Sequence, residues 1–302
     1  MINEAYEPSS EGLIIYLFHG VLDTPSKGVT NAIRKHIEKE YFEAVLKNAL
    51  QSGTPLSMDE VLQIKQERRR YPPRSFAVTF DDGFENNYSV AAPILEELNI
   101  PATFYVTTDY VDRNLMSWID RIEYCLETAT EGRVTLPWES NARRFKGDSE
   151  KLEILNEIRL RVKSDASIEV TTLVSQIFHQ CGVPVVSQLS DQLNKKMSWE
   201  QVRRLHGEKL FTIGGHSHSH PILAFLSGPR LREEIETSIR LLKERAGIES
   251  RHYAYPEGKA HHYNESVIAV LKEHGIICCP SAIEGINSGE EDLFDLKRTM
   301  VV

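Results

Sequence analysis

The sequence has few cysteines, no long apolar run and a deficit of basic residues, and each shortage excludes a class of protein. Its four cysteines, at positions 125, 181, 278 and 279, show no Cys-x-x-Cys spacing, so we expect reduced residues in or near the core. No stretch approaches the roughly 18 apolar residues of a membrane-spanning helix. The N-terminus lacks the basic region and apolar stretch of a signal peptide. We therefore expect a cytoplasmic protein without a membrane span.

Basic residues number 35 against 44 acidic ones, which gives a net charge of −9. The one basic run, Arg68-Arg69-Arg70, lies just before Pro72-Pro73 and is typical of a solvated loop or helix end. Nucleic acid is therefore not an expected partner. A hydrophobic content of 41% and a charged content of 26% are globular values. The length of 302 residues suits either one α/β barrel with an insertion or two domains.

The most informative stretch reads Thr79-Phe80-Asp81-Asp82-Gly83. It closes the run from Ser75 to Phe80, whose β-branched and aromatic residues predict a buried strand. Because successive strand side chains point to opposite faces, Asp81 and Asp82 are free to do different jobs, one binding a metal and the other handling a proton. The same residues also suit a plain strand-to-turn junction, since Asp-Gly is common in tight turns.

A second stretch, from Ile213 to Pro221, concentrates three of the eleven histidines into five residues. Histidine is the commonest metal ligand. On a strand, His216, His218 and His220 would share a face, whereas in a turn or helix only His216 and His220 would. A solvated polar loop is the alternative for the histidines alone. Together with the paired aspartates, however, they predict a metal site.

A third candidate is His19, which ends the apolar run from Gly12 to Gly20 that reads as the first buried strand. Active sites of barrels and doubly wound sheets gather at the carboxyl ends of strands. His19 is therefore a candidate for a functional role, and a histidine merely hydrogen-bonded at a turn is the alternative.

The order of elements indicates parallel strand pairing with one interruption. Helical patterns at 40–50 and 88–98 and a strand at 100–106 follow the first strands. From residue 115 to 196, charged helix-favouring stretches replace strand signals. We therefore divide the chain into a first barrel part (1–114), a helical insertion (115–196) and a second barrel part (197–302) with strands near 210–213, 251–258, 275–279 and 294–302. Trp118 is placed to line a groove, although a tryptophan at such a seam also simply packs.

Four motifs, in their order and spacing, resemble the NodB-type polysaccharide deacetylases, the family-four carbohydrate esterases. These motifs are Thr79-Phe80-Asp81-Asp82-Gly83, Met197-Ser198-Trp199-Glu200, His216-Ser217-x-x-His220-Pro221 and Tyr253-Ala254-Tyr255-Pro256-x-Gly258. The resemblance covers roughly residues 12–112 and 197–302. It implies an α/β fold, a distorted (β/α) barrel with fewer strands than a full TIM barrel, here carrying a helical insertion.

The resemblance also implies site roles. Asp82, His216 and His220 would hold one divalent metal, usually zinc, with positions left open for water and substrate. Asp81 would be the general base as water attacks the amide of an N-acetylated sugar or glycan, and acetate would leave. The oxyanion needs a backbone donor beside Pro256, which has no N–H, so Tyr255 is our expected donor and Glu257 the alternative.

Two family motifs are missing. Ala254 and Glu257 stand where an arginine and an aromatic residue are expected, and we expect Arg298 to grip Asp81 in a fork instead. The Leu-x-His motif that supplies the general acid is absent, and His19 is the natural substitute. His218 suits packing or solvent better.

Two other functions stay open at this stage. The same metal site would also suit hydrolysis of a non-sugar amide, as in allantoinase-like or imidase relatives of this barrel. The missing motifs also allow a catalytically inactive sugar-binding protein. If the chain is a deacetylase, the insertion favours short or carrier-linked sugars over long polymers.

Overall fold

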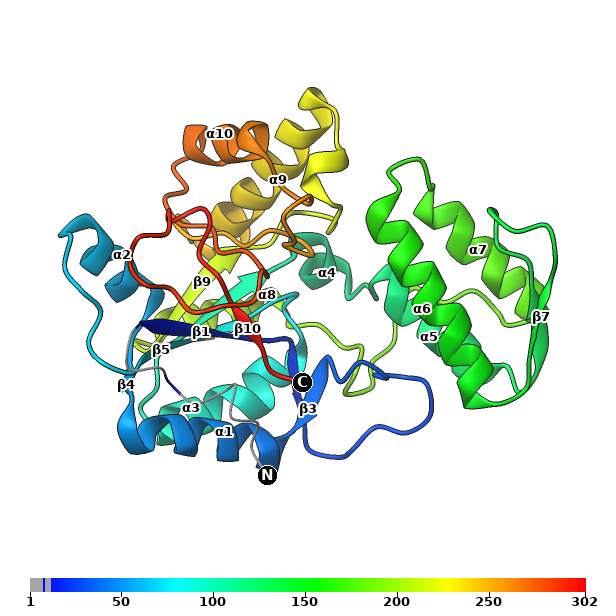
Figure 1. Ribbon diagram of the computed structural model, residues 1–302, viewed down its shortest axis with the longest axis horizontal. Coiled ribbons are helices and arrows are strands. Elements are labelled where there is room, and N and C mark those ends of the chain that lie inside the picture. The colour runs from blue at the N-terminus through cyan, green and yellow to red at the C-terminus, as the bar shows by residue number, and fades with distance from the viewer. Residues whose placement is uncertain (1–7, 9–11) are drawn as a thin grey trace.

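The computed structural model describes residue 8 and residues 12–302, and it shows an α/β body with a helical unit beside it (Figure 1). The strands are β1 (Leu13–Phe18), β2 (Gly20–Leu22), β3 (His36–Glu38), β4 (Thr54–Pro55), β5 (Ser75–Phe80), β6 (Ala102–Val106), β7 (Gly132–Val134), β8 (Arg143–Phe145), β9 (Phe211–Gly215) and β10 (Thr299–Met300). The helices are α1 (Lys39–Ser52), α2 (Met58–Gln66), α3 (Ala92–Glu97), α4 (Thr108–Arg113), α5 (Trp118–Thr128), α6 (Asp148–Ser164), α7 (Val170–Cys181), α8 (Trp199–Gly207), α9 (Gly228–Ala246) and α10 (Glu265–Glu273). A π-helical turn (Asn87–Ala91) precedes α3, and a 3-10 turn (Leu223–Phe225) precedes α9.

The main sheet is parallel throughout, in the order β10-β1-β5-β6-β9, with β4 beside β5. The predicted α/β fold with parallel strands is therefore confirmed. Two further strands, expected near 251–258 and 275–279, are reduced to isolated parallel bridges that continue the ring beyond β9, Gly215 with Tyr253 and His252 with Cys278. Pro256 and Pro280 follow them closely, and proline cannot donate to a ladder. The last strand is likewise shorter than expected, since β10 covers only Thr299–Met300.

A row of aromatic rings sets the register at the carboxyl ends of three neighbouring strands. Phe18 of β1 pairs with Phe80 of β5, which pairs with Phe104 of β6. Their stacked ring centroids lie 5.3 Å and 5.0 Å apart, and all three side chains are buried. Because burial of one face fixes register strongly, the residues that follow these rings emerge at a common level. The row therefore positions His19 and the aspartate pair.

Residues 115–196, which we call the helical insertion, supply most of a second apolar core, to which Val29 of the α/β body also belongs. Helices α5, α6 and α7 and the β7–β8 hairpin surround it, on one side of the α/β body (Figure 1). Its fully or almost fully buried members include Ile122, Cys125, Leu126, Leu155, Ile158, Val174, Ile177 and Phe178. A core of this size makes the insertion a packed unit rather than a loose loop.

The cysteines lie in or near the core. All four cysteines are free, and three of them are buried while Cys181 is half-buried, as expected for reduced residues in or near the core. Among the described residues, no helix is both long enough and apolar enough to span a bilayer.

Candidate metal centre and catalytic site

The predicted site residues meet at one edge of the parallel sheet. His19 follows β1, Asp81 and Asp82 follow β5, and His216 follows β9. Strands β6 and β9 pair in register up to Val106 and Gly215, so the histidine segment leaves the sheet close to the aspartates. Parallel strands bring their carboxyl ends to the same edge, which is where sites of α/β folds form.

Three donor groups converge closely at this edge. Asp82 Oδ1 lies 3.3 Å from His220 Nε2 and 3.6 Å from His216 Nε2. All three ligand atoms lie within 4.8 Å of one another. The side chains of Asp82, His216 and His220 are 7%, 2% and 11% exposed, so the cluster is largely withdrawn from solvent.

Backbone conformation and hydrogen bonds aim these groups inward. Asp82 and His220 have φ angles of +76° and +63°, in the left-handed region that non-glycine residues seldom adopt. His216 Nδ1 lies 2.9 Å from the Ala254 carbonyl oxygen, which fixes the ring and directs Nε2 toward Asp82. The His220 N–H donates to Ser217 Oγ at 2.9 Å. Strained residues of this kind persist where surrounding structure holds them, and they are common at functional sites.

The donor set fits a divalent transition metal. Two imidazoles and one carboxylate are ligands of catalytic zinc, and donors about 2.0–2.1 Å from a tetrahedral ion lie about 3.3 Å apart. The separations of Asp82 Oδ1 from His220 Nε2 and His216 Nε2, 3.3 Å and 3.6 Å, are close to this expected distance between donors. Asp82 Oδ1 is buried, and its close polar neighbours among the described residues are the Nε2 atoms of His220 and His216 at 3.3 Å and 3.6 Å. A buried carboxylate oxygen beside two imidazole nitrogens is suited to binding a divalent cation.

The charges of the cluster favour ionised Asp82. Burial acts to raise the pKa of Asp82, but the neighbouring histidines, His220 foremost and then His19 and His216, hold it well below its usual value. Burial likewise acts to lower the pKa of His220, and the Asp82 carboxylate more than offsets this, so that this pKa is raised. For His216, burial dominates and lowers the pKa. Ionised carboxylate and neutral imidazole are the forms that bind a metal.

Arg298 makes the forked contact to Asp81 that we expected. Its Nη1 and Nη2 donate to the two Asp81 carboxylate oxygens, each at 2.8 Å, and its Nε donates to the Ser281 carbonyl at 2.6 Å. The Arg298 and Asp81 side chains are 0% and 5% exposed. Burial acts to raise the pKa of Asp81, but the guanidinium holds it below its usual value. Asp81 Oδ2 also lies 3.8 Å from His216 Nε2, so this oriented carboxylate adjoins the three donor groups.

His19 lies next to both aspartates. Its Nδ1 is buried without a hydrogen-bond partner among the described residues, and its carbonyl accepts a hydrogen bond from Asn87 Nδ2 at 2.7 Å. Burial lowers the pKa of His19, and the charges of Asp82 and Asp81 only partly oppose this. An imidazole nitrogen without a partner at the edge of the cluster is free to exchange a proton.

The turn after Tyr253 forms another side of the site. The Tyr255 hydroxyl donates to the Phe294 carbonyl at 3.0 Å, and its ring stacks on Tyr263 with 4.0 Å between centroids. No acceptor for the Tyr255 N–H is found among the described residues. Glu257, just beyond Pro256, adopts a φ of +61° and acts electrostatically on His220.

Two other sequence candidates lie away from the donor cluster. Trp118 is the first residue of α5 and packs against the core of the helical insertion. No contact joins it to the three donor groups within the described residues. His218 Nδ1 lies 2.9 Å from Thr108 Oγ1, and its N–H donates to Glu234 at 2.8 Å, so this histidine faces α4 and α9.

Beside Asp82 lies a buried group of charges that sequence reasoning did not identify as a unit. Lys35 forms an ion pair with Asp120 of the helical insertion, and both side chains are nearly buried. Lys196 is buried too, 4.0 Å above the Phe84 ring, and burial lowers its pKa to about 8. These residues come from three distant segments, and no spacing rule in the sequence connects them.

Comparison with known proteins adds a family and a fold. The model of the polysaccharide deacetylase family matches residues 68–145 and 164–278, including parts of the helical insertion that the motifs alone leave outside. No curated protein matches the chain.

Three solved structures are similar over almost the whole chain. IcaB from Ammonifex degensii is 19% identical with a TM-score of 0.63, covering 98% of this chain and 94% of that one. The Streptococcus pyogenes deacetylase PplD in complex with acetate is 15% identical with a TM-score of 0.60, covering 96% and 92%. The BpsB deacetylase domain from Bordetella bronchiseptica is 16% identical with a TM-score of 0.57, covering 97% of each chain. At these identities the likeness concerns the fold.

Proposed function

Because this chain belongs to the polysaccharide deacetylase family, we propose that it hydrolyses the N-acetyl group of an amino sugar, alone or in a short or carrier-linked glycan. Asp82, His216 and His220 would hold one divalent ion, with zinc as the first candidate. Bound there, the ion would polarise the amide carbonyl and lower the pKa of water. The observation that carries the proposal is the convergence of these donors, from segments more than 130 residues apart, around the buried Asp82 Oδ1.

Asp81 is the proposed general base. The two-point contact with Arg298 keeps its carboxylate ionised and fixes its direction. The carboxylate therefore accepts a proton from the attacking water without first having to reorient. Arg298 itself acts through Asp81, as a positioning residue.

The Tyr255 N–H is the proposed donor to the oxyanion that forms on the amide carbonyl. A donor of this kind helps only if it is held in place before the reaction. The Tyr255 side chain is anchored by its hydroxyl contact with Phe294 and by stacking on Tyr263. Pro256 adds rigidity, since its ring fixes φ.

His19 is the proposed general acid for the leaving amine. Its free Nδ1 adjoins the aspartates, and its position after β1 places it on the same edge as the donor cluster. Because its pKa is lowered, the protonated form is the minor one at neutral pH. The role therefore requires that turnover decrease as pH rises above that lowered pKa.

The deciding experiment combines metal analysis with a substrate panel. Wild type, Asp82→Ala, His216→Ala and the exposed control His206→Ala are purified and assayed for bound metal, then for acetate release from N-acetylated amino sugars and their oligomers. We expect metal in wild type and the control only. Asp81→Asn should keep the metal and lose acetate release.

The other outcomes separate the alternatives. Activity on cyclic ureides or imides without acetate release would favour a non-sugar amidohydrolase. Binding of metal and sugar with no turnover, unchanged in Asp81→Asn, would favour an inactive sugar-binding protein. Full metal content in Asp82→Ala and His216→Ala would overturn the proposed centre.

A further inference from the structure

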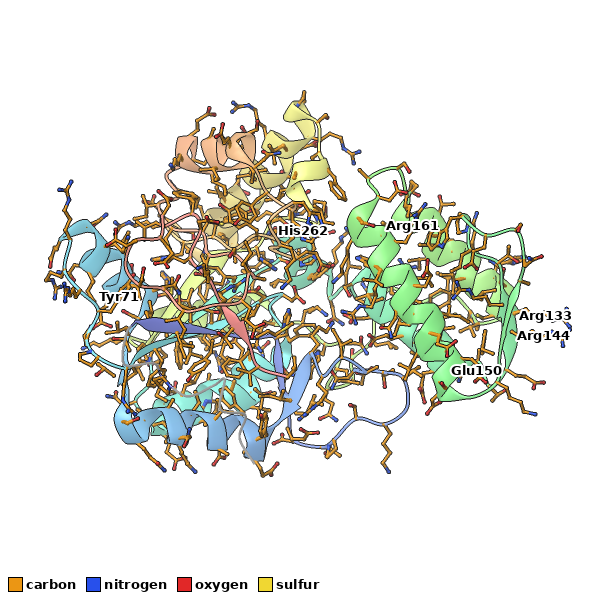
Figure 2. All side chains as sticks on the ribbon, viewed as in Figure 1. Tyr71, Arg133, Arg144, Glu150, Arg161 and His262 are labelled. Atoms are coloured by element: carbon orange, nitrogen blue, oxygen red, sulfur yellow. The ribbon has the colours of Figure 1, made fainter. Side chains whose placement is uncertain are left out.

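The basic run Arg68-Arg69-Arg70, which the proposed function does not use, lines one side of a cavity of about 980 Å³. Lys65, near the end of α2, and Tyr71 belong to the same side, and residues 288–290 form the other. Figure 2 shows Tyr71 at the end of the molecule opposite the helical insertion. We call this space the basic cavity, because four of its lining residues are cationic and one, Glu290, is acidic.

The backbone at Arg68 adopts a conformation that suits glycine better than arginine. Helix α2 ends in a turn in which the Arg68 N–H donates to the Lys65 carbonyl at 3.1 Å and the Arg69 N–H donates to the Ile64 carbonyl at 2.9 Å. In this turn Arg68 has a φ of +53°, in the left-handed region. Glycine adopts that region without strain and is the usual residue at this position after a helix. An arginine kept there indicates a use for its side chain.

The charges of the basic run are only partly neutralised. Arg69 Nε donates to Glu67 Oε2 at 2.5 Å, whereas the described part of the chain offers no acceptor to the exposed guanidinium groups of Arg68 and Arg70. The helix dipole favours cations in the last turn of α2, but Arg70 lies beyond that turn. Like charges gathered at one cavity repel each other, and an anion bound among them would remove this repulsion.

The walls of the basic cavity are held in place by contacts of their own. Lys65 Nζ donates to the Gly289 carbonyl, which ties α2 to residues 288–290 and leaves two ammonium hydrogens for a ligand. The Glu291 carboxylate accepts the Ser288 and Gly289 N–H groups at 3.1 Å and 3.0 Å. After the basic run, the rings of Pro72 and Pro73 fix the backbone. A preformed site of this kind spends little free energy on ordering when a ligand binds.

We propose that the basic cavity binds a phosphate-bearing ligand, with a diphosphate group preferred. Guanidinium groups match the geometry of phosphate oxygens and remain charged throughout the physiological pH range. Because several cations line one cavity, a group with more than one negative charge gains more than a single carboxylate does. The volume of about 980 Å³ also suits a small-molecule ligand. A long nucleic acid would extend past the cavity, over a chain whose net charge is −9.

The basic cavity lies at the opposite edge of the sheet from the donor cluster. Tyr71 and Pro73 come just before β5, whereas Asp81 and Asp82 follow it. At about 3.3 Å per residue, Pro73 and Asp81 lie roughly 25 Å apart. A diphosphate in the cavity therefore does not reach the donor groups, and the proposal does not depend on the proposed function.

The first test is calorimetric titration of the full chain with pyrophosphate. The double variant Arg68→Gly with Arg70→Ala removes both guanidinium groups that lack a partner, and Arg230→Ala, an exposed arginine in the first turn of α9, is the control. We expect a saturable site in wild type and in the control, with a Kd at least about tenfold higher in the double variant, the change that loss of one charged hydrogen bond produces. Added salt should weaken binding, and acetate at matched ionic strength should not compete. A metal at the donor cluster would also attract pyrophosphate, but that binding would persist in the double variant.

A second arm identifies the source of the phosphate. Sedimentation with phosphatidylglycerol vesicles but not with phosphatidylcholine vesicles, lost in the double variant, would identify the ligand as a lipid headgroup. Because glycine suits the backbone at residue 68, the Tm of Arg68→Gly should stay within about 2 °C of wild type. Unchanged binding of pyrophosphate or vesicles by the folded double variant would overturn the proposal. So would equal competition by acetate, or a wild-type protein that binds neither.

Discussion

Removal of the Arg298 guanidinium gives the sharpest test of how Asp81, the proposed general base, is kept ionised and oriented. The Arg298→Met variant keeps an unbranched apolar stem and deletes both 2.8 Å contacts to Asp81. Asp81 then remains buried, 5% exposed, without its partner. Breaking a buried ion pair from one side costs about 3–5 kcal/mol, since the remaining charge is left uncompensated. For 302 residues, an unfolding entropy of about 0.6 kcal/mol/K converts this cost into a decrease in Tm of roughly 5–8 °C.

The same change predicts a shift in the pH profile. Arg298 opposes the effect of burial and keeps the pKa of Asp81 below its usual value, so in wild type the base is ionised throughout the neutral range. Without Arg298, burial acts nearly unopposed and that pKa rises. The acidic limb of kcat/KM should therefore move to higher pH, with a larger loss of activity at pH 5 than at pH 8.

Two companion variants separate charge from geometry. Arg298→Lys keeps a positive charge but loses the fork, so we expect an intermediate acidic limb and incomplete activity. The double variant Asp81→Asn with Arg298→Met removes both charges and should recover most of the lost stability, because no ion is left unpaired. An acidic limb at the wild-type position in Arg298→Met, or a double variant no more stable than the single one, would show that Arg298 does not prepare Asp81.

Three further predictions concern other parts of the molecule. His19→Ala should abolish turnover while bound metal stays at the wild-type level, and undiminished turnover would exclude His19 as the acid. Gly214→Ala would place a Cβ 2.4 Å and 2.6 Å from atoms of the Tyr105 ring, so we expect its free energy of unfolding, measured with urea, to fall by about 1–3 kcal/mol. Gly207→Ala is the control, because its added Cβ would have nothing within 4 Å, and we expect almost no change. Burial raises the pKa of Glu123 from 4.5 to about 7, so its contribution to stability is full below pH 4.5 and is lost as pH rises toward 7. Glu123→Gln should therefore be more stable than wild type at pH 8, by about 2–3 kcal/mol, and equal slopes of stability against pH in the two proteins would contradict this.

Many of the strands and helices were predictable because the sequence signals that specify them are local. The strand from Ser75 to Phe80 and the helices after Ser57 and Ser198 lie where pattern and capping residues indicate, and both capping boxes are present. The donor cluster was predictable for the same reason. Its members sit at the exits of parallel strands, where sequence position largely decides spatial position.

Other strands and helices were harder to predict because neighbouring residues favour different backbone conformations. The segment around Tyr253 has strand-forming residues, but Pro256 and the turn at Glu257 limit it to an isolated bridge. The helix after Asn86 begins with a π-helical turn, in which the Asn87 side chain donates to the His19 carbonyl. Hydrophobic periodicity does not register a one-residue change in helix winding, so this detail lay beyond the sequence patterns.

The contacts of the helical insertion were the least predictable, because they pair charged side chains that are 85 and 94 residues apart in sequence. Lys35 with Asp120 and Lys163 with Glu257 read in the sequence as ordinary surface charges. Only the folded chain shows that Lys35 and Lys196 are buried beside Asp82 and that Asp120 is the acidic partner of Lys35.

This arrangement has a consequence for how the insertion can be studied. Deleting residues 115–196 would remove Asp120, the partner of Lys35, and would uncover the segment between β2 and β3 that packs against the insertion. It would also remove the acceptors of the Val29 and Asn31 N–H groups. A deletion would therefore disturb the segment between β2 and β3 as well as remove the insertion. Changes in substrate preference can be assigned to the insertion only with single side-chain variants that leave the Lys35–Asp120 ion pair in place.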